Sequence, residues 1–467
     1  VRSNLSPHGV YGSAIQTQKA MKKTIVLGLS AAAISAGVAA LLSFTTSPAD
    51  FSATNACCHK PADAQPKASS SRSIGGCVFK TVYEGEGVHE NMMLKTPEEV
   101  LTSENRAYDW MRSAQNNDGG FAAGNHASQN VMDPHASPSD PATTAMVAMS
   151  LLRAGSTPES GLFANILARS TEFLLTAVEK SDENATNITD LQGTQIQVKL
   201  GANIDVALTS QYISNLIGRM PCTHPKRDRW MRAQDKCVRK IQQAQASNGA
   251  VQGGSWAGVL QSSFATNALE SAQHNGAAVD TIALDKARDY QKANFDASTG
   301  TVATGEAAGI TLYAVSGSTR SSAKEARKAE EDIARAKKDG KLPAAAPVTA
   351  DNLQQAGYSR DEAEKMTTAY NVYNAAKVQA QSDDVVRGFG NNGGEEFLSF
   401  LQTGESLIIN NDQSWKNWYQ STTARLVDIQ NSDGSWSGHH CITSPVFCTA
   451  TALLILSVNN DIETLVA

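Results

Sequence analysis

The chain has 467 residues, of which 41% are hydrophobic and 18% are charged, so most of it can bury a core and a wholly disordered protein is excluded. Its 40 Lys and Arg against 46 Asp and Glu give a formal net charge of −6, which excludes a basic field strong enough to hold nucleic acid non-specifically. Aromatic residues make up only 6% of the chain, and this favours helices packed through small residues over an aromatic-lined cavity.

The first segment of the chain predicts export. Residues 1–20 lie upstream of a better start at Met21, and we interpret them as a start-site overcall. Met21-Lys22-Lys23 precedes an uncharged, apolar stretch at 24–44, which is the pattern of a secretory signal peptide, with an uncleaved membrane anchor as the alternative. Residues 45–95, which begin with Ser, Thr, Ala, Pro and Asp without periodicity, predict a flexible linker. We therefore expect an exported protein (periplasmic, extracellular or anchored facing outside) that contacts a membrane only through this segment.

The seven cysteines fit an oxidising compartment. Cys222 and Cys237 are close enough in sequence for a disulfide that bridges the ends of a short connection, and the same holds for Cys441 and Cys448. The other three lie in the predicted linker: Cys57, Cys58 and Cys77.

One unit recurs through the rest of the chain. A helical stretch ends in Gln, a polar turn with Asp or Asn and Gly follows, and an aromatic residue precedes the next helix. Gly allows the positive φ of such a turn, the Asn or Asp side chain bonds the turn's own backbone, and the Gln can bond backbone at a neighbouring helix end. A weaker copy surrounds Gln291. The residues that define the clear copies are Gln115 and Gly120, Gln245 and Trp256, and Gln430, Asp433, Gly434 and Trp436.

The units predict six pairs of helices. The first helices are expected at about 97–115, 159–179, 228–246, 280–294, 352–379 and 412–430. Smaller and more apolar partners are expected at about 139–155, 203–218, 256–274, 304–316, 393–408 and 443–457. Six outer and six inner helices close a ring, and closure avoids an apolar face that an open array leaves at its ends. A charged helical excursion at 321–341 is expected to be solvated rather than to bind a ligand.

This pattern resembles the QW repeats of the prenyltransferase/squalene-oxidocyclase superfamily, over about residues 97–457. The resemblance implies an all-α fold, an (α/α)6 toroid of six helix hairpins over residues 96–460, preceded by the signal peptide and the linker. It also implies chemistry that the chain departs from. The DxDD motif of squalene-type cyclases is absent, and Asp383-Asp384 is the nearest acid pair. The Gly-Cys-Gly-Glu-Gln signature of thioester proteins is absent as well, since Gly393-Gly394-Glu395-Glu396 lacks both reacting residues.

A zinc site of the prenyltransferase type is the remaining expectation from the resemblance. The Asp-x-Cys pair of that family is missing, although His439, His440 and Cys448 are candidate metal ligands. Without metal, Glu395 and Glu396 would satisfy amides at a helix N-terminus, while Cys441 and Cys448 would form a disulfide. The candidate cavity cluster comprises Glu395, Glu396, His439, His440, Cys448 and Asp205, where Asp205 is first expected to cap a helix.

Two functions are compatible with these residues. The first is an exported toroid that binds an apolar or peptide ligand, or a partner chain, in its central cavity, without the usual catalytic motifs and without a cofactor. The alternative is a divergent prenyltransferase-like or terpene-cyclase-like enzyme, with zinc as its candidate cofactor. No catalytic residue is assigned, because a fold of this kind says little about a reaction.

Trp436 is expected to be buried where the last helix pair meets the first, so Trp436→Ala tests the closure of the ring. Replacing a buried Trp by Ala costs about 3–5 kcal/mol, and the melting temperature should fall sharply. An exposed charge swap within 321–341, such as Lys341→Glu, serves as the control and should change the melting temperature little. A Trp436→Ala variant that melts like the parent but loses ligand binding would place this residue in the binding site instead.

Overall fold

The computed structural model describes residues 92–390 and 393–466. The chain divides into two units, residues 1–54 and 55–467, and all described residues belong to the second unit. The predicted segments at 1–20 and 21–44, nearly all of the linker at 45–95, and Cys57, Cys58 and Cys77 lie outside the described residues. The packed body includes Met92, ahead of the expected start at residue 96, because Met92 is buried and its carbonyl accepts a hydrogen bond from Trp415 Nε1 at 2.8 Å.

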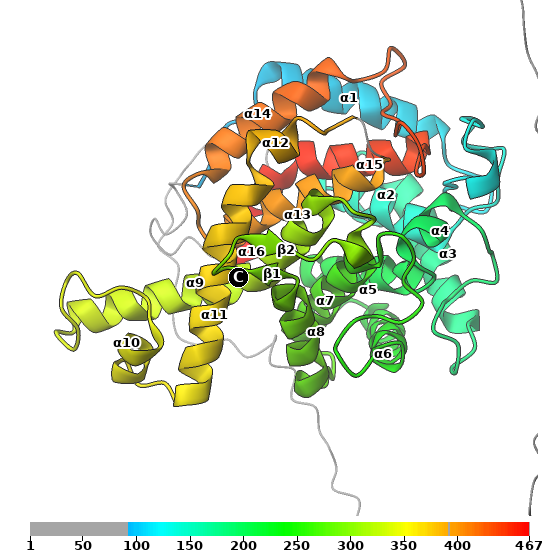
Figure 1. The fold of residues 1–467 in the computed structure, drawn as a ribbon. Coiled ribbons are helices and arrows are strands. Elements are labelled where there is room, and N and C mark those ends of the chain that lie inside the picture. The colour runs from blue at the N-terminus through cyan, green and yellow to red at the C-terminus, as the bar shows by residue number, and fades with distance from the viewer. Residues whose placement is uncertain (1–91, 391–392, 467) are drawn as a thin grey trace, which may run out of the picture. The chain divides into compact units, whose positions relative to one another are not determined.

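The described part is built mainly of helices, as predicted (Figure 1). The outer helices are amphipathic and bury one face: α1 (Glu98–Ser113), α3 (Ala164–Lys180), α6 (Arg227–Gln243), α8 (Thr281–Ala293), α11 (Arg360–Ala380) and α14 (Trp415–Asp428). The inner helices, which are more apolar than the outer ones except for α9, are the following: α2 (Pro141–Arg153), α5 (Ile204–Arg219), α7 (Gly258–His274), α9 (Thr311–Lys338), α13 (Glu395–Ile409) and α15 (Pro445–Leu456). Every residue of α2, α13 and α15 is buried.

Short elements join these helices. They are α4 (Gln195–Leu200), α10 (Ala350–Gln355), α12 (Asp383–Val386), α16 (Ile462–Val466) and the 3-10 turns η2 (His126–Ser128), η3 (Gly305–Ala307) and η4 (Val458–Asp461). The strands β1 (Phe295–Asp296) and β2 (Thr301–Val302) form one antiparallel pair, in which Phe295 faces Val302.

The contacts between the inner helices return to their starting point. Helix α2 packs on α5, α5 on α7, α7 on α9, α9 on α13, α13 on α15, and α15 again on α2. Each later outer helix packs on the inner helix that precedes it in the sequence, and α1, which has no predecessor, packs on α15. The first helix therefore covers the last inner helix, as the burial of an apolar α15 requires.

The Gln of each repeat holds two segments together, as predicted. Gln430 Nε2 donates to the carbonyl of Gly434 at 2.8 Å, which closes its own turn, and to the carbonyl of Ser103 in α1 at 2.9 Å. Arg106 adds bonds to Gln430 Oε1 and to the turn's carbonyls. The equivalent bonds join Gln115 to Gly119 and to Ile166 of α3, and Gln245 to Gly249 and to Ala283 of α8. Each Gln thus ties its turn to the outer helix of the next pair.

The residue two positions after the turn glycine is buried in each copy, and its backbone N–H donates to a hydroxyl of the following inner helix. These residues are Phe121, Val251 and Trp436, with Thr144, Ser262 and Thr449 as acceptors. The burial of Trp436, at 1% exposure, was predicted correctly. Trp256 was predicted to be the aromatic residue of the second copy, and this was wrong. Val251 fills the buried position after that turn, whereas Trp256 is 62% exposed. Gln291 is not part of a fourth copy, since its Nε2 atom donates into α7, to Val259.

The charged segment at 321–341 is helical as far as Lys338, where α9 ends, so its helical character was predicted correctly. Its apolar residues, such as Ala329 and Ile333, cluster with Ala363 and Met366 of α11. Its charged residues occupy the other face. The expected helix at 352–379 is two helices, α10 and α11, because Ser359 begins a new capping box with Glu362.

The predicted disulfides are not formed between the cysteines that the structure describes. Cys237 is fully buried in α6, where burial raises the pKa of its thiol to about 12. Cys441 and Cys448 are held apart by separate partners: the ammonium of Lys199 lies 3.6 Å from Cys441 Sγ, whereas Cys448 Sγ donates to the carbonyl of Ile442 at 3.8 Å.

Across residues 92–390 and 393–466, no single helix is both long and apolar enough to cross a membrane. One pair of helical segments, Pro445–Leu456 and Val458–Val466, is bent by 61° and is long and apolar enough to cross a membrane by length and composition alone.

The turn glycines generate a test of the repeat geometry. Gly434 has a φ of 96°, and a Cβ atom there would lie 2.6 Å from the carbonyl oxygen of Arg106 in α1. Gly340 has a φ of 72° and no atom within 4 Å of its Cβ position, so Gly340→Ala measures the backbone strain alone. We expect Gly434→Ala to lower the free energy of unfolding by about 1–3 kcal/mol more than Gly340→Ala, in urea denaturation. Equal losses in the two variants would show that α1 does not press on this turn.

Candidate functional site

Helix α4 lies across the starts of several inner helices. Thr194 begins it with a capping box, in which Thr194 Oγ1 accepts from the Gln197 N–H and the Gln197 side chain accepts from the Thr194 N–H. Gly201 ends it with a φ of 126°, and a Cβ atom there would meet the Gln261 side chain at 2.3 Å. The helix contacts α5, α7 and η2, and almost all of it is buried.

The charged end of α4 is buried against the start of α13. Lys199 Nζ lies 3.0 Å from Glu395 Oε1, and the exposed fractions of the two side chains are 6% and 1%. The same ammonium lies 3.6 Å from Cys441 Sγ and 5.3 Å from the ring centre of Trp256, the exposed aromatic residue at this end. A buried ion pair of this kind is costly to break, because removal of one partner leaves a buried charge uncompensated.

The amide end of α4 is bound by the segment before α15. Gln195 Oε1 accepts from the N–H groups of Thr443 and Ser444 at 2.8 and 2.9 Å, and its Nε2 atom donates to Thr443 Oγ1 at 3.1 Å. Gln129, just after η2, holds the same segment through Cys441 N–H and Thr443 Oγ1. Helix α4 is therefore bound at both ends by residues that lie roughly two hundred positions or more later in the chain.

The carboxylates of α13 have different surroundings. Glu396 Oε1 accepts from the N–H of Gly390 at 2.8 Å, a backbone amide that precedes α13 and does not belong to the helix N-terminus, where its partner was expected. Glu395 pairs with Lys199 instead, and its Oε2 atom accepts no hydrogen bond from the described residues. The hydroxyl of Tyr313 is also buried without a hydrogen-bond partner among them. Burial, and after it the charges of Glu395 and Glu396, raise the pKa of Tyr313.

The two thiols beside Glu395 are held in the neutral form. Burial raises the pKa of Cys448, and the Glu395 carboxylate adds to this effect. Burial and Glu395 also raise the pKa of Cys441, against the opposing charge of Lys199. Cys441 has a φ of 61°, a conformation that costs energy in residues other than glycine. Its N–H donates to Gln129, and this bond helps to hold that conformation.

The metal-ligand prediction is not supported by the geometry. His439 and His440 are exposed and contact each other, with ring centres 5.3 Å apart, whereas Cys448 is buried and bonded to Ile442. In the part of the chain that the structure describes, no three His, Cys, Asp or Glu side chains come together as metal ligands. The structure thus unites Glu395 with Cys448 but leaves the two histidines outside this cluster.

Asp205 does not cap α5, contrary to expectation. It lies in the first turn, fully buried, where its Oδ2 atom accepts from Gln197 Nε2 at 3.0 Å and its Oδ1 atom has no partner among the described residues. Burial, and the charge of nearby Asp140, raise the pKa of Asp205 to about 8. Asp140 does cap α2, accepting from the N–H groups of Thr143 and Ala123, and burial raises its pKa to about 6.

A small cavity of about 10 Å³ lies among the inner helices, lined in part by Gln211, Arg153, Glu405 and Asp461. This volume holds about one water molecule. This cavity is too small for the large ligand that was predicted.

Sequence reasoning missed Lys199, Gln195, Tyr313 and Cys441. The capping box Thr194-x-x-Gln197 was the available signal for α4. The partners of α4 were not readable, since Glu395 and Thr443 are distant in the sequence.

No family model matches this chain, and no match was found among curated proteins or among solved structures.

The raised pKa of Asp205 predicts a pH dependence of stability. In the unfolded chain this group titrates near pH 4, but in the folded protein it keeps its proton up to about pH 8. The folded state therefore binds more protons between these values, and the free energy of unfolding falls as pH rises through this window. We expect Asp205→Asn to reduce the loss of stability between pH 5 and pH 8 by at least about 1.4 kcal/mol, the equivalent of one pKa unit.

The measurement is urea denaturation at both pH values. Asp384→Asn is the control, because the Asp384 side chain is 93% exposed and its removal should leave the pH dependence unchanged. Asp140 and Glu104, whose pKa values burial raises to about 6 and about 7, account for the slope that remains. An Asp205→Asn variant with the same pH dependence as the parent would contradict the protonation of Asp205.

Proposed function

We propose that this chain is an exported (α/α)6 toroid that binds a peptide segment of a partner protein at the end where its inner helices begin. The cyclic order of contacts among the inner helices and the bonds from Gln430 to α1 support the toroid. The basic and apolar residues at 21–44 support export.

The observation that carries the proposal is that this end of the ring already holds a peptide segment, the chain's own α4. Glu395 binds its cationic side chain, and the Thr443 and Ser444 amides bind its Gln side chain. These partners lie at the starts of α13 and α15. A buried carboxylate recognises a cationic side chain and backbone amides recognise a side-chain oxygen, so both select a side chain by its charge and hydrogen bonding rather than by its size. A segment of another chain with the same groups would compete with α4.

The small size of the cavity among the inner helices supports binding at this end rather than in that cavity. Ligand sites usually have about 300–1,000 Å³, whereas the cavity among the inner helices has about 10 Å³. Displacement of α4 would expose the groups that now hold it, Glu395 and the amides of Thr443 and Ser444, and would not require the inner helices to move. The ligand class follows from the pairing of Gln195 with Lys199: a helical turn with an amide side chain and, four residues later, a cation.

One observation favours the alternative, a divergent enzyme of the prenyltransferase or cyclase kind. Glu395 Oε2 and the Tyr313 hydroxyl are buried without hydrogen-bond partners among the described residues. Unsatisfied buried polar groups beside charged ones are typical of catalytic sites. This alternative predicts no gain of peptide binding when α4 is loosened.

The test uses an end-capped synthetic peptide of residues 194–200 and fluorescence anisotropy. The parent should not bind it, because α4 fills the site. Lys199→Ala loosens α4 but keeps Glu395, so this variant should bind the peptide. Glu395→Gln loosens α4 as well but removes the carboxylate, so it should bind at least tenfold more weakly than Lys199→Ala.

Hydrogen exchange of the α4 amides shows whether each variant has loosened the helix. If α4 exchanges faster in Lys199→Ala and the peptide still does not bind, the proposal is wrong. Gln195→Ala is a second loosened variant that keeps Glu395, and it replaces Lys199→Ala if the latter does not fold.

A further inference from the structure

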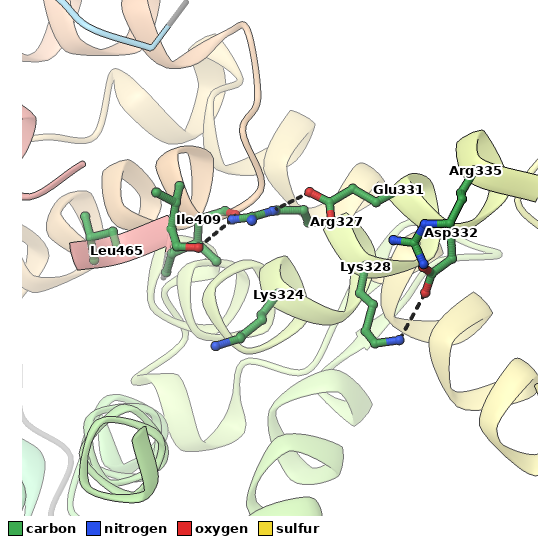
Figure 2. Close-up of a pocket in the computed structure, with 9 residues that line it drawn as sticks. Lys324, Arg327, Lys328, Glu331, Asp332, Arg335, Ile409 and Leu465 are labelled. Carbon is green, nitrogen blue, oxygen red and sulfur yellow. Dashed lines mark hydrogen bonds and ion pairs between the residues drawn. The ribbon is translucent and has the colours of Figure 1, made fainter. Parts of the chain in front are cut away.

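A second candidate site lies on the charged half of α9, far in sequence from the residues that hold α4. A pocket of about 320 Å³ opens between this half of α9 and the last residues of α13 and α16. The volume is at the lower end of the range of small-molecule sites. Figure 2 shows Lys324, Arg327 and Lys328 on α9, with Ile409 and Leu465 beside them.

The cations of the pocket come from one face of α9. Lys324, Lys328, Glu331 and Arg335 follow one another at spacings of three and four residues, which places them in one stripe. Arg327 adjoins this stripe, three residues after Lys324 and four before Glu331. The opposite face packs on α11. Four cationic side chains and two acidic ones line the pocket, so its net charge is positive.

Most of these charges have a partner. Arg327 pairs with Glu331 at 2.8 Å and donates to the carbonyls of Ile409 and Val466, the last residues of α13 and α16. Lys328 and Arg335 both pair with Asp332.

Lys324 differs from the other cations. It is exposed, and it forms no hydrogen bond or ion pair with any residue in the described ranges. Glu270 attracts it from beyond ion-pair distance. A ligand that binds this ammonium therefore breaks no hydrogen bond or ion pair between Lys324 and the described residues.

The other wall of the pocket is aliphatic. Ile409, Leu465 and Val466 line it. Ile409 and Val466 are only 4% and 7% exposed, so the half-buried Leu465 supplies most of the apolar area that a ligand can reach. Apolar area that a ligand covers there contributes roughly 25 cal/mol per Å². The pocket thus offers one uncommitted cation next to an apolar surface.

We propose that this pocket binds a small amphipathic monoanion, a carboxylate with a short aliphatic tail, whose head group pairs with Lys324 and whose tail covers Ile409 and Leu465. Glu331 and Asp332 at the same pocket disfavour a ligand with more than one negative charge. This site is separate from the peptide site proposed above, and neither proposal depends on the other.

Isothermal titration calorimetry of the full chain with octanoate tests the site. Octanoate should bind with a stoichiometry of one, and acetate, which lacks the tail, should show no binding. Lys324→Gln should weaken octanoate binding at least tenfold, and Leu465→Ser should also weaken it. Lys341→Gln is the matched control, because Lys341 is exposed and outside the pocket, and its affinity should equal that of the parent.

Three results would overturn the inference. Octanol that binds as tightly as octanoate would show that apolar contact alone holds the ligand. An unchanged affinity in Lys324→Gln would place the head group elsewhere. No heat of binding with millimolar octanoate would show that the pocket takes no such ligand.

Discussion

The hydrogen bonds by which a Gln at the end of one outer helix holds the next outer helix close the helix array. The inner helices α2, α13 and α15 are buried along their whole length, so each of them must be covered all round. Gln430 and Arg106 achieve this for the last pair, because they fasten its turn to α1 across more than three hundred residues of sequence. Trp436 then packs behind that turn, with its indole N–H bonded to the carbonyl of Leu426.

The two ends of the helix array are stabilised in different ways. At the C-terminal ends of the inner helices, Arg153 bonds Asp461 at 2.6 Å, Glu405 at 2.9 Å and the carbonyl of Leu454 at 2.8 Å. One guanidinium thus joins three segments, and cations are favoured where helices end. At the N-terminal ends, carboxylates take this place: Asp140, Asp205, Glu395 and Glu396 all lie at or within the first turn of an inner helix.

Two of these carboxylates are incompletely satisfied. Asp205 has one buried oxygen, and Glu395 two, that accept no hydrogen bond from the described residues. Such groups lower stability, and they persist where surrounding contacts hold them in place. The proposed peptide site depends on this, since Glu395 is available to a cation only because no backbone amide satisfies it.

Local sequence patterns were sufficient to predict the all-α class, the helix pairs, the Gln–Gly turns and the helical excursion. Each of these depends on residues close together in the chain: apolar periodicity, caps, and glycines at positive φ. Trp256 was misplaced because an aromatic residue near a turn has no local mark that distinguishes it from Val251, which fills the buried position. The tertiary contacts could not be predicted in this way: Lys199 meets Glu395, Cys441 and Cys448 have separate partners, and Lys324 and Leu465 line the same pocket. These contacts join segments that approach each other only after the helices have packed, and no local pattern specifies which distant side chains then meet.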